Sequence, residues 1–332
     1  MKTLLLRLKH HLKEYYKLLI VFTIFFFVLT YRLPYTIYEP GGLINISDNL
    51  NVKTNDKGSL NLTYVNAQTA TLPSLLFSYL KSDWDVVNND TFVPDNESLV
   101  EANKRDVIML YESISNAIYV AYTANDMEPN IINKSVYVKY VTPEAKTDLK
   151  PGDLLLQVDD VEIENSYDAL NYINSKKPGD KVNIKVAVDN KEVMRKAELV
   201  DFNGTTLIGI TLSNVFEYKD VVSYLYNSKE AGPSGGLMIS LAIYNALNKE
   251  DITKGLKISG TGTINLDGTI GAIGGVKYKL AGAVKKDADI FIVPAGENYE
   301  EALKLVKKNK YKIKLIEAKD FNQVLREIKN YK

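Results

Sequence analysis

The sequence predicts an α/β (α+β) C-terminal domain, preceded by a β-rich domain and an apolar N-terminal helix. Three observations predict this arrangement. An uncharged apolar block covers residues 18–31, and alternating strand-like segments with one helix cover residues 126–204. From residue 205 onward, strand-like runs alternate with helical ones. With 332 residues, the chain has room for about two domains of ordinary size.

Composition excludes much of enzyme chemistry. The chain has no cysteine, and its two histidines, His10 and His11, precede any segment that resembles a folded domain. A thiol nucleophile, a disulfide framework, a thiolate zinc site and a Ser-His-Asp triad are therefore excluded, and we expect neither a metal nor a cofactor. The 41 basic and 41 acidic residues leave no basic excess, which argues against a nucleic-acid partner.

The N-terminal charge pattern is typical of a membrane anchor. Residues 1–17 carry five basic residues against the single acid Glu14, whereas Arg32 is the only charge in residues 18–38. We therefore predict a cytoplasmic basic tail over 1–17 and a transmembrane signal anchor over 18–38, which places everything after residue 40 outside the cell membrane. A buried core helix and a cleaved secretory signal are the alternatives, although no small-residue cleavage site follows the block.

The next region, residues 41–125, is predicted to be an extracellular segment of short strands followed by a helix. Residues 60–65 alternate between apolar and polar side chains, as in a strand. Apolar residues then recur at helical spacing, which predicts a helix over 99–121.

Residues 126–204 contain a second set of signals. The segment SVYVKYVTPEAKTDLKPGDLLLQVDDVEIENSYDALNYI, residues 135–173, resembles a PDZ domain of the bacterial, protease-associated type. The resemblance implies that this domain binds extended peptides, often carboxyl termini, by adding a strand to a sheet edge. The segment 134–137, taken as the carboxylate-binding loop, lacks the usual glycines, so the peptide preference stays open. A PDZ fold that serves only as a spacer is the alternative.

One glycine-rich segment could carry chemistry. Gly232-Pro233-Ser234-Gly235-Gly236 directly precedes a strongly apolar helix predicted over 234–247. A helix amino terminus presents unpaired N–H groups that suit an oxyanion, and Ser234 stands where a nucleophile would. Serine is also a common helix cap, which is the alternative. Since no histidine is available, the base would be a carboxylate or a lysine whose pKa burial lowers, and a second glycine-marked helix carries Lys277 and Lys279.

Three motifs in order resemble the proteolytic domain of the Lon family over residues 205–332. They are GPSGG at 232–236, KISGTGTINLDGTIGAIGGVKYKLAGA at 257–283 and DADIFIVPAGEN at 287–298. The resemblance implies that Ser234 is the nucleophile and that Lys279, rather than Lys277, is the general base. It also implies that the hydroxyl of Ser259 hydrogen-bonds this lysine.

The same resemblance places Gly232 and Pro233, with the amide of Ser234, in the oxyanion-hole loop. Two departures from the family pattern are visible. Ala231 stands where the ATP-dependent Lon enzymes have aspartate, and the sequence contains no phosphate-binding loop of the G-x-x-x-x-G-K-[ST] type.

The sequence therefore predicts a membrane-tethered, ATP-independent serine endopeptidase with a Ser–Lys dyad. Its expected partners are small or unfolded exported and membrane proteins, which the PDZ domain recruits or gates, together with the lipid bilayer. A homo-oligomer is a further expectation, because Lon-type domains often form rings. The alternatives are a catalytically inactive, membrane-anchored PDZ scaffold and proteolysis of the chain itself.

Overall fold

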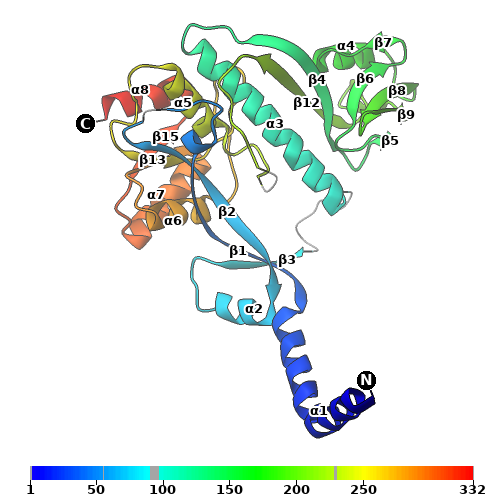
Figure 1. Cartoon of the computed structure of the whole chain (residues 1–332). Coiled ribbons are helices and arrows are strands. Elements are labelled where there is room, and N and C mark those ends of the chain that lie inside the picture. Colours follow the sequence, from blue (N-terminus) through cyan, green and yellow to red (C-terminus); the bar gives the residue numbers. More distant parts are fainter. Residues whose placement is uncertain (1, 55, 90–96, 228–229, 332) are drawn as a thin grey trace. The chain divides into compact units, whose positions relative to one another are not determined.

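The computed structural model describes residues 2–54, 56–89, 97–227 and 230–331, and the chain divides into two compact units (Figure 1). The first unit comprises residues 1–40 and 65–92, and the second comprises residues 41–64 and 93–332. Two long strands, β1 (Arg32–Asn45) and β2 (Ser59–Thr71), contribute residues to both units. A short 3-10 helix, η1 (Ile46–Asn49), lies between them in the chain.

The first unit contains two helices and a short strand. They are α1 (Lys2–Thr30), α2 (Leu72–Ser78) and β3 (Asp85–Asn88). Strand β3 pairs antiparallel with β1, so that Asp85 faces Tyr38 and Asn88 faces Tyr35. Helix α2 begins at a capping box in which Thr71 and Ser74 satisfy each other's backbone amides.

Helix α1 differs from the predicted anchor over 18–38. It ends at Thr30, and the backbone continues as strand β1 from Arg32. The uncharged part of the helix is therefore shorter than the about 20 residues that a membrane span needs. In the part of the chain that the structure describes, no helix combines the length and the apolar character required to cross a membrane. The side chains of residues 1–12, His10 and His11 among them, lie outside the described part.

In the second unit, residues of β2 form one parallel sheet with three C-terminal strands. The strand order is β15-β14-β13-β2, with β13 (Lys257–Gly260), β14 (Ile290–Pro294) and β15 (Lys314–Ala318). Helices connect these strands, as parallel pairing requires. They are α6 (Val276–Lys285) between β13 and β14 and α7 (Glu297–Asn309) between β14 and β15, while α5 (Gly236–Leu247) precedes β13 and α8 (Phe321–Asn330) follows β15.

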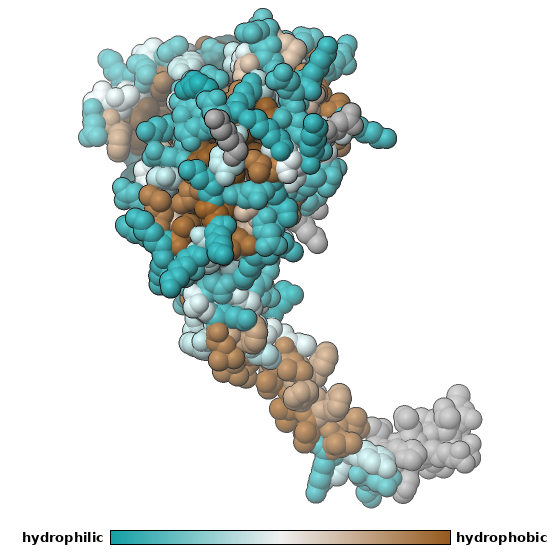
Figure 2. All heavy atoms as spheres, turned by 90° about the vertical axis from the view of Figure 1, so that its left-hand side faces the viewer, coloured by the Kyte–Doolittle hydropathy of each residue, from teal (hydrophilic) through white to brown (hydrophobic). Residues whose placement is uncertain are grey.

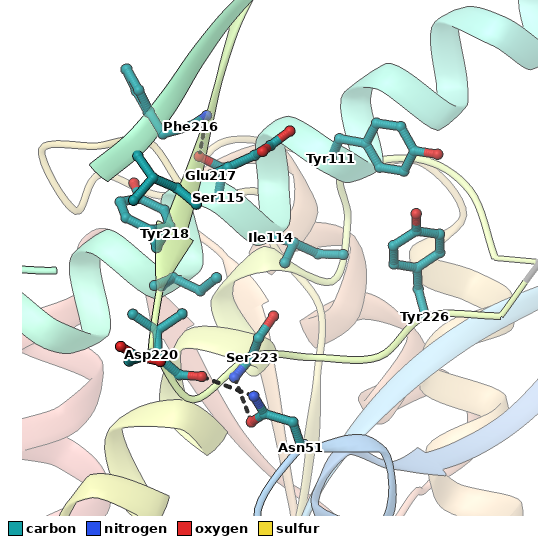
Figure 3. A pocket seen from close by; sticks show the side chains of 13 residues that line it. Asn51, Tyr111, Ile114, Ser115, Phe216, Glu217, Tyr218, Asp220, Ser223 and Tyr226 are labelled. Atoms are coloured by element: carbon teal, nitrogen blue, oxygen red, sulfur yellow. Dashed lines mark hydrogen bonds between the residues drawn. The ribbon is translucent and has the colours of Figure 1, made fainter. Parts of the chain in front are cut away.

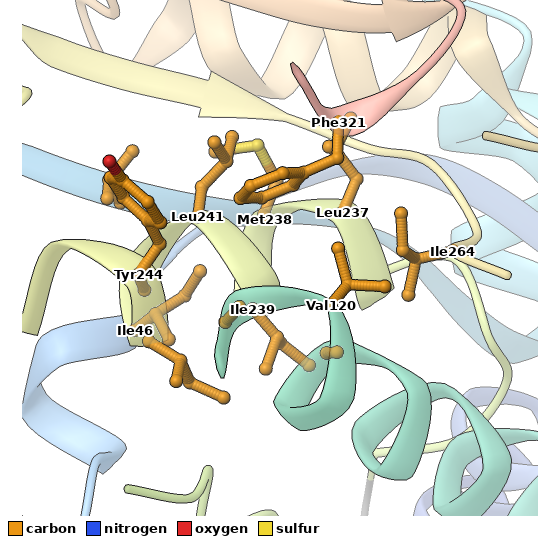
Figure 4. Close-up of a cluster of buried hydrophobic side chains, with 14 of the residues drawn as sticks. Ile46, Val120, Leu237, Met238, Ile239, Leu241, Tyr244, Ile264 and Phe321 are labelled. Atoms are coloured by element: carbon orange, nitrogen blue, oxygen red, sulfur yellow. The ribbon is translucent and has the colours of Figure 1, made fainter. Parts of the chain in front are cut away.

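The sheet is covered on both faces, and its strand β14 is apolar throughout. Ile290 and Ile292 of β14 pack in a core with α3, α5 and α8, whereas Phe291 and Val293 pack on the other face with α6 and α7. Alternation along the strand sends successive side chains to opposite faces, which explains the continuous run IFIVP. Helix α5 is buried almost all round because it lies between the sheet and α3. Figure 4 shows its Leu237, Met238, Ile239 and Leu241 in that core.

Helix α3 (Leu99–Thr123) confirms the predicted helix over 99–121, but it does not stand apart from the C-terminal domain. Leu110, Ile114, Ala117 and Ala121 lie on one face, three or four residues apart, and enter the core that contains α5. Residues 41–64 likewise contribute β2 and η1 to this unit. The predicted segment 41–125 therefore supplies part of the C-terminal domain's core.

The middle of the chain forms a second, mainly antiparallel sheet of the order β12-β4-β6-β8-β9-β5, with β7 paired to β6. A separate hairpin, β10–β11, follows β9 in the chain. The elements are β4 (Asn130–Val141), β5 (Lys146–Thr147), β6 (Leu154–Val158), β7 (Val161–Glu162), α4 (Ser166–Asn174), β8 (Lys181–Val188), β9 (Lys191–Glu198), β10 (Val200–Phe202), β11 (Thr205–Leu207) and β12 (Ile210–Lys219). A turn forms at Lys150–Asp153, where the Asp153 amide donates to the Lys150 carbonyl at 3.0 Å and Gly152 has a φ of +100°.

The predicted boundary between residues 204 and 205 does not coincide with a break in the sheets. Strand β12 pairs with β4 along its whole length, from Ile210 opposite Val141 to Lys219 opposite Asn130. Ile208 is buried in the core of the middle domain as well. The middle domain therefore extends through Lys219, because its last strand pairs with its first.

Candidate active site

The predicted nucleophile lies at the carboxyl end of strand β13. Thr261 and Gly262 follow this strand, and both hydrogen-bond the backbone of Ser234. The carbonyl of Ser234 accepts from the Gly262 amide at 2.8 Å and from Thr261 Oγ1 at 3.0 Å. The amide of Leu237 in turn donates to the Gly262 carbonyl at 3.1 Å. These contacts hold the start of α5 against the strand end, where α/β proteins commonly place their sites.

Lys279 approaches the same point from helix α6. Its side chain is 5% exposed, and Nζ donates a hydrogen bond to Thr261 Oγ1 at 3.1 Å. Burial disfavours the charged ammonium and lowers the pKa of Lys279 to about 8. Lys277, two residues earlier, lies on another side of the helix because successive residues turn by about 100°, and it is only half-buried.

The side chain of Ser234 does not cap helix α5. The N-cap residue is Gly235, and no side chain makes a capping hydrogen bond there. Among the described residues, the Ser234 hydroxyl has no hydrogen-bond partner, and its link to Lys279 runs through the backbone carbonyl and Thr261. The alternative that Ser234 is a helix cap therefore has no support in this geometry.

Ser259 does not make the contact that the sequence predicted. It is fully buried within β13, and its hydroxyl donates to the carbonyl of Ile290 in the neighbouring strand at 2.9 Å. The hydroxyl that bonds Lys279 belongs to Thr261, the first residue after the strand ends. Both hydroxyl residues of the segment SGTG precede a glycine, so Thr261 could have been chosen from the same motif.

The predicted oxyanion loop also needs correction. The amide of Gly232 donates to the carbonyl of Asp106 in α3 at 2.9 Å, and Pro233 has no N–H group. Within the described ranges, the amides of Ser234 and Gly235 have no acceptor, so these two N–H groups are the ones able to meet an oxyanion. Gly232 instead shapes the loop, since its φ of +83° lies in the left-handed region that favours glycine.

Helix α3 braces the nucleophile loop, which the sequence did not predict. Besides the Asp106 contact, Ser113 Oγ donates to the carbonyl of Pro233 at 2.9 Å, and Asn116 Nδ2 donates to the carbonyl of Ile264 at 3.0 Å. A Cβ on Gly236 would meet Ser113 Oγ at 2.5 Å, so glycine is needed where α5 passes α3. The sequence signal was a run of small and polar residues, SISNA at 113–117, in the middle of a predicted helix.

In the middle domain, the segment 134–137 named from the sequence lies inside the sheet, and the terminal strand β12 is covered in part by α3, since the Phe216 amide donates to Ser115 Oγ at 3.0 Å. Val136 and Tyr137 lie in β4, which pairs with β12 on one side and β6 on the other. Strand β12 is the terminal strand of this sheet. Gly209, at φ +86°, lies just before it between apolar residues, which is the sequence signal for this edge.

A cavity of about 570 Å³ lies apart from the dyad, between α3, the end of β12 and residues 220–226 (Figure 3). Tyr111 and Tyr226 face each other across it with ring centroids 5.4 Å apart. Their hydrogen bond, with burial, raises the pKa of Tyr226 to about 12. None of the predicted site residues lines this cavity. Among the described residues, no three acidic or histidine side chains group as metal ligands.

Comparisons with known proteins identify both domains. Residues 222–330 match the Lon protease (S16) C-terminal proteolytic domain, and residues 102–199 match the PDZ domain. Lon protease from Trichlorobacter lovleyi is 30% identical over 95 residues, which cover 29% of this chain and 11% of that protein. Lon protease 2 from Bacillus subtilis is 35% identical over 97 residues, which cover 29% of this chain and 16% of that protein. The chain thus spans less than a fifth of these relatives' length.

Two solved structures match the middle domain. The PDZ domain of an SdrC-like protein from Listeria monocytogenes is 35% identical and covers 23% of this chain and 85% of its own, with a TM-score of 0.22. The second domain of a Listeria protein, solved in solution, is 37% identical and covers 24% of this chain and 82% of its own, with a TM-score of 0.21.

Proposed function

We propose, from the Lon-type serine protease domain that residues 222–330 form, that this chain is an endopeptidase in which Ser234 is the nucleophile and Lys279 the general base. The observation that carries the assignment is the burial of Lys279 beside Thr261. A lysine with a pKa of about 8 is neutral in about a tenth of the molecules at pH 7 and in about half at pH 8, whereas an ordinary lysine is almost entirely charged at both, and only the neutral amine can accept a proton.

The reaction proceeds through an acyl-enzyme. Neutral Lys279 takes the proton of the Ser234 hydroxyl as its oxygen attacks the scissile carbonyl, and the amides of Ser234 and Gly235 hold the resulting oxyanion. The lysine then gives the proton to the leaving amine as the peptide bond breaks. Water, activated by the same lysine, releases the acyl group and restores the serine hydroxyl. Rotation of the Ser234 side chain toward Nζ in the substrate complex completes the dyad, since catalytic hydrogen bonds often tighten only on binding.

Three alanine variants of the full chain test this proposal against the inactive-scaffold alternative. Ser234→Ala and Lys279→Ala should each lower the cleavage rate of an unfolded protein substrate by about a thousandfold or more, because a catalytic unit fails when either member is lost. Lys277→Ala is the matched control, since it removes a lysine of the same helix, and it should keep most of the activity. Wild-type protein that cleaves no peptide, or activity that survives in Lys279→Ala but not in Lys277→Ala, contradicts the assignment.

The PDZ domain is proposed to bind extended peptide segments, carboxyl termini among them, at the edge of β12. Support comes from the terminal position of this strand in its sheet. The sequence carries no ATP-binding loop, so we further propose that the substrates are small or already unfolded exported and membrane proteins, cleaved without added ATP.

The chain is proposed to be attached to the cell membrane through α1, with its basic tail in the cytoplasm and its catalytic domain outside. Because the uncharged block is short, this arrangement requires the long side chains of Lys17 and Arg32 to extend from either end of the block toward the headgroups. The support is the exposure of Phe22, Phe25 and Phe26, each more than half exposed in a helix that leaves these side chains uncovered. Flotation of the full chain with phosphatidylcholine vesicles tests the attachment. Protein that stays at the bottom of the gradient contradicts it.

A further inference from the structure

Helix α2 presents the opposite of the usual burial pattern. Its only buried residue is Ser78, while the large apolar side chains of the helix and of its end are exposed. We call these exposed residues the α2 patch: Leu72, Leu76, Phe77, Tyr79 and Leu80. Leu76 is 61% exposed and Leu80 is 78% exposed. Single exposed apolar residues are normal in soluble proteins, but a contiguous group indicates an interaction surface.

The pairing of β3 with β1 places this patch at the membrane-proximal end of the first unit. Strand β3 follows the patch in sequence and pairs with residues 35–38 of β1, a few residues after α1 ends at Thr30. Helices α1 and α2 also contact one another. Figure 2 shows the hydrophobic colour continuing from this part of the unit along α1. The α2 patch and the apolar block of α1 are therefore neighbouring parts of one apolar surface.

The residues around the patch have the composition of a membrane interface. Trp84, the single tryptophan of the chain, packs edge-to-face on Phe77 with ring centroids 5.5 Å apart. Lys81 Nζ lies 5.2 Å from the same ring. Tryptophan and tyrosine prefer the boundary between lipid chains and water, and a lysine stem can lie along apolar surface while its ammonium reaches the headgroups.

We propose that the α2 patch inserts into the interfacial layer of a lipid bilayer beside α1, as a second, non-spanning membrane contact. The inference rests on the proposed attachment through α1. A bilayer fits this surface better than a protein partner because the patch adjoins the apolar block of α1 and carries the aromatic and lysine residues of an interface. Two contacts hold a protein on a membrane more firmly than one, by the same logic that makes paired lipid anchors stable.

The single tryptophan makes the proposal directly measurable. The full chain is reconstituted with phosphatidylcholine vesicles, and Trp84 emission is recorded with lipids brominated either near the headgroup or near the ends of the acyl chains. We expect Trp84 emission to shift to shorter wavelength and to be quenched more strongly by the shallow bromines. In the Leu76→Asp/Leu80→Asp variant, both the shift and the quenching should be lost, because charged side chains stay out of the apolar layer.

Phe202→Asp is the matched control. It places an aspartate at another exposed apolar residue, in the β10–β11 hairpin, and should leave the Trp84 signal unchanged. Because the substituted side chains are exposed, all variants should fold, and their peptidase activity reports that they do.

Flotation of the full chain with the same vesicles is measured in parallel. Protein that does not float contradicts the α1 attachment and this inference together, whereas protein that floats with unquenched Trp84 contradicts this inference alone. If Trp84 is shielded from aqueous iodide but is not quenched by the brominated lipids, a second protein copy covers the α2 patch. That result also contradicts the inference that the patch inserts into the bilayer.

Discussion

At the scale of single residues, the site depends on a lysine held where its charged form is unfavourable. Lys279 is almost fully buried, and the one described hydrogen bond of its Nζ goes to the neutral hydroxyl of Thr261. The difference between the ordinary pKa of 10.5 and about 8 corresponds to about 3 kcal/mol, at about 1.4 kcal/mol per pH unit. Burial of this lysine therefore destabilises the folded state at neutral pH, but it also makes available the neutral amine, which is the base that the reaction needs.

The first prediction is that Lys279→Met abolishes peptide cleavage and stabilises the fold. Methionine fills a similar volume without a charge, so at pH 7 the free energy of unfolding should rise by about 1–3 kcal/mol. Between pH 8 and 10.5 the unfolded state binds more protons at this lysine than the folded state does, so wild-type stability rises with pH and the advantage of the variant shrinks. Denaturant unfolding at pH 7 and pH 10 measures both effects. A Lys279→Met protein less stable than wild type at pH 7 would contradict the buried, neutral lysine.

The second prediction concerns Thr261, which positions Lys279 rather than reacting itself. Thr261→Val removes the hydroxyl that joins the lysine to the Ser234 carbonyl and should lower kcat by about tenfold to a hundredfold. In the wild type, we expect activity to rise with pH and the pH–rate profile to have its midpoint near pH 8, and Thr261→Val should move this midpoint. Thr261→Ser should restore both. Ser259→Ala, which removes a hydroxyl bonded only to Ile290, is the control and should leave the midpoint in place.

The sequence pointed to the proposed reacting residues better than to their surroundings. The glycine-marked helix starts pointed to Ser234 and to a lysine of α6, because glycine segments before helices are a local signal, whereas the choice of Lys279 over Lys277 came from the resemblance to the Lon family. The choice of Ser259 over Thr261 failed because it depends on where β13 ends and which strand lies beside it. The bracing of Gly232 and Pro233 by α3 is likewise a contact between distant segments, and no local pattern encodes it.

At the scale of elements, long-range strand pairing decides the domain boundaries. The alternation of strands and helices predicted after residue 205 is present from α5 to α8, since apolar periodicity is local. Strand β12, however, pairs with β4, which lies about 90 residues earlier at the matched positions Asn130 and Lys219. The apolar periodicity of a strand does not show which distant strand it pairs with. The sequence therefore assigned residues 205–219 to the C-terminal domain, whereas in the structure β12 belongs to the sheet of the middle domain.

The third prediction tests this boundary. A fragment of residues 126–204 lacks β12 and Ile208, so β4 is left as an unpaired edge and the core loses a buried side chain. We expect it to be unfolded or aggregated, whereas a fragment of residues 126–219 should fold. Dispersion of amide signals in proton–nitrogen NMR spectra distinguishes the two. Equal dispersion in both fragments would show that β12 is dispensable for this domain.

At the scale of the whole molecule, four segments meet at one point. Helix α3, the loop 232–236, the end of β13 and helix α6 converge, although the PDZ domain separates α3 from the other three in the chain. Helix α3 also contacts the PDZ sheet, because Ser213 Oγ donates to Glu112 at 2.8 Å and the Phe216 amide donates to Ser115 Oγ at 3.0 Å. One helix therefore connects the edge strand of the PDZ domain with the nucleophile loop.

The central claim is that Lys279 activates Ser234, and covalent labelling of the folded full chain tests it most directly. A fluorophosphonate reacts with an activated serine, and mass spectrometry of the digested protein locates the adduct. We predict a single adduct on Ser234, formed at a rate that rises as the pH passes through about 8, and no adduct in Lys279→Met protein that remains folded. Labelling at another residue, or equal labelling of Ser234 in the Lys279→Met variant, would contradict the account.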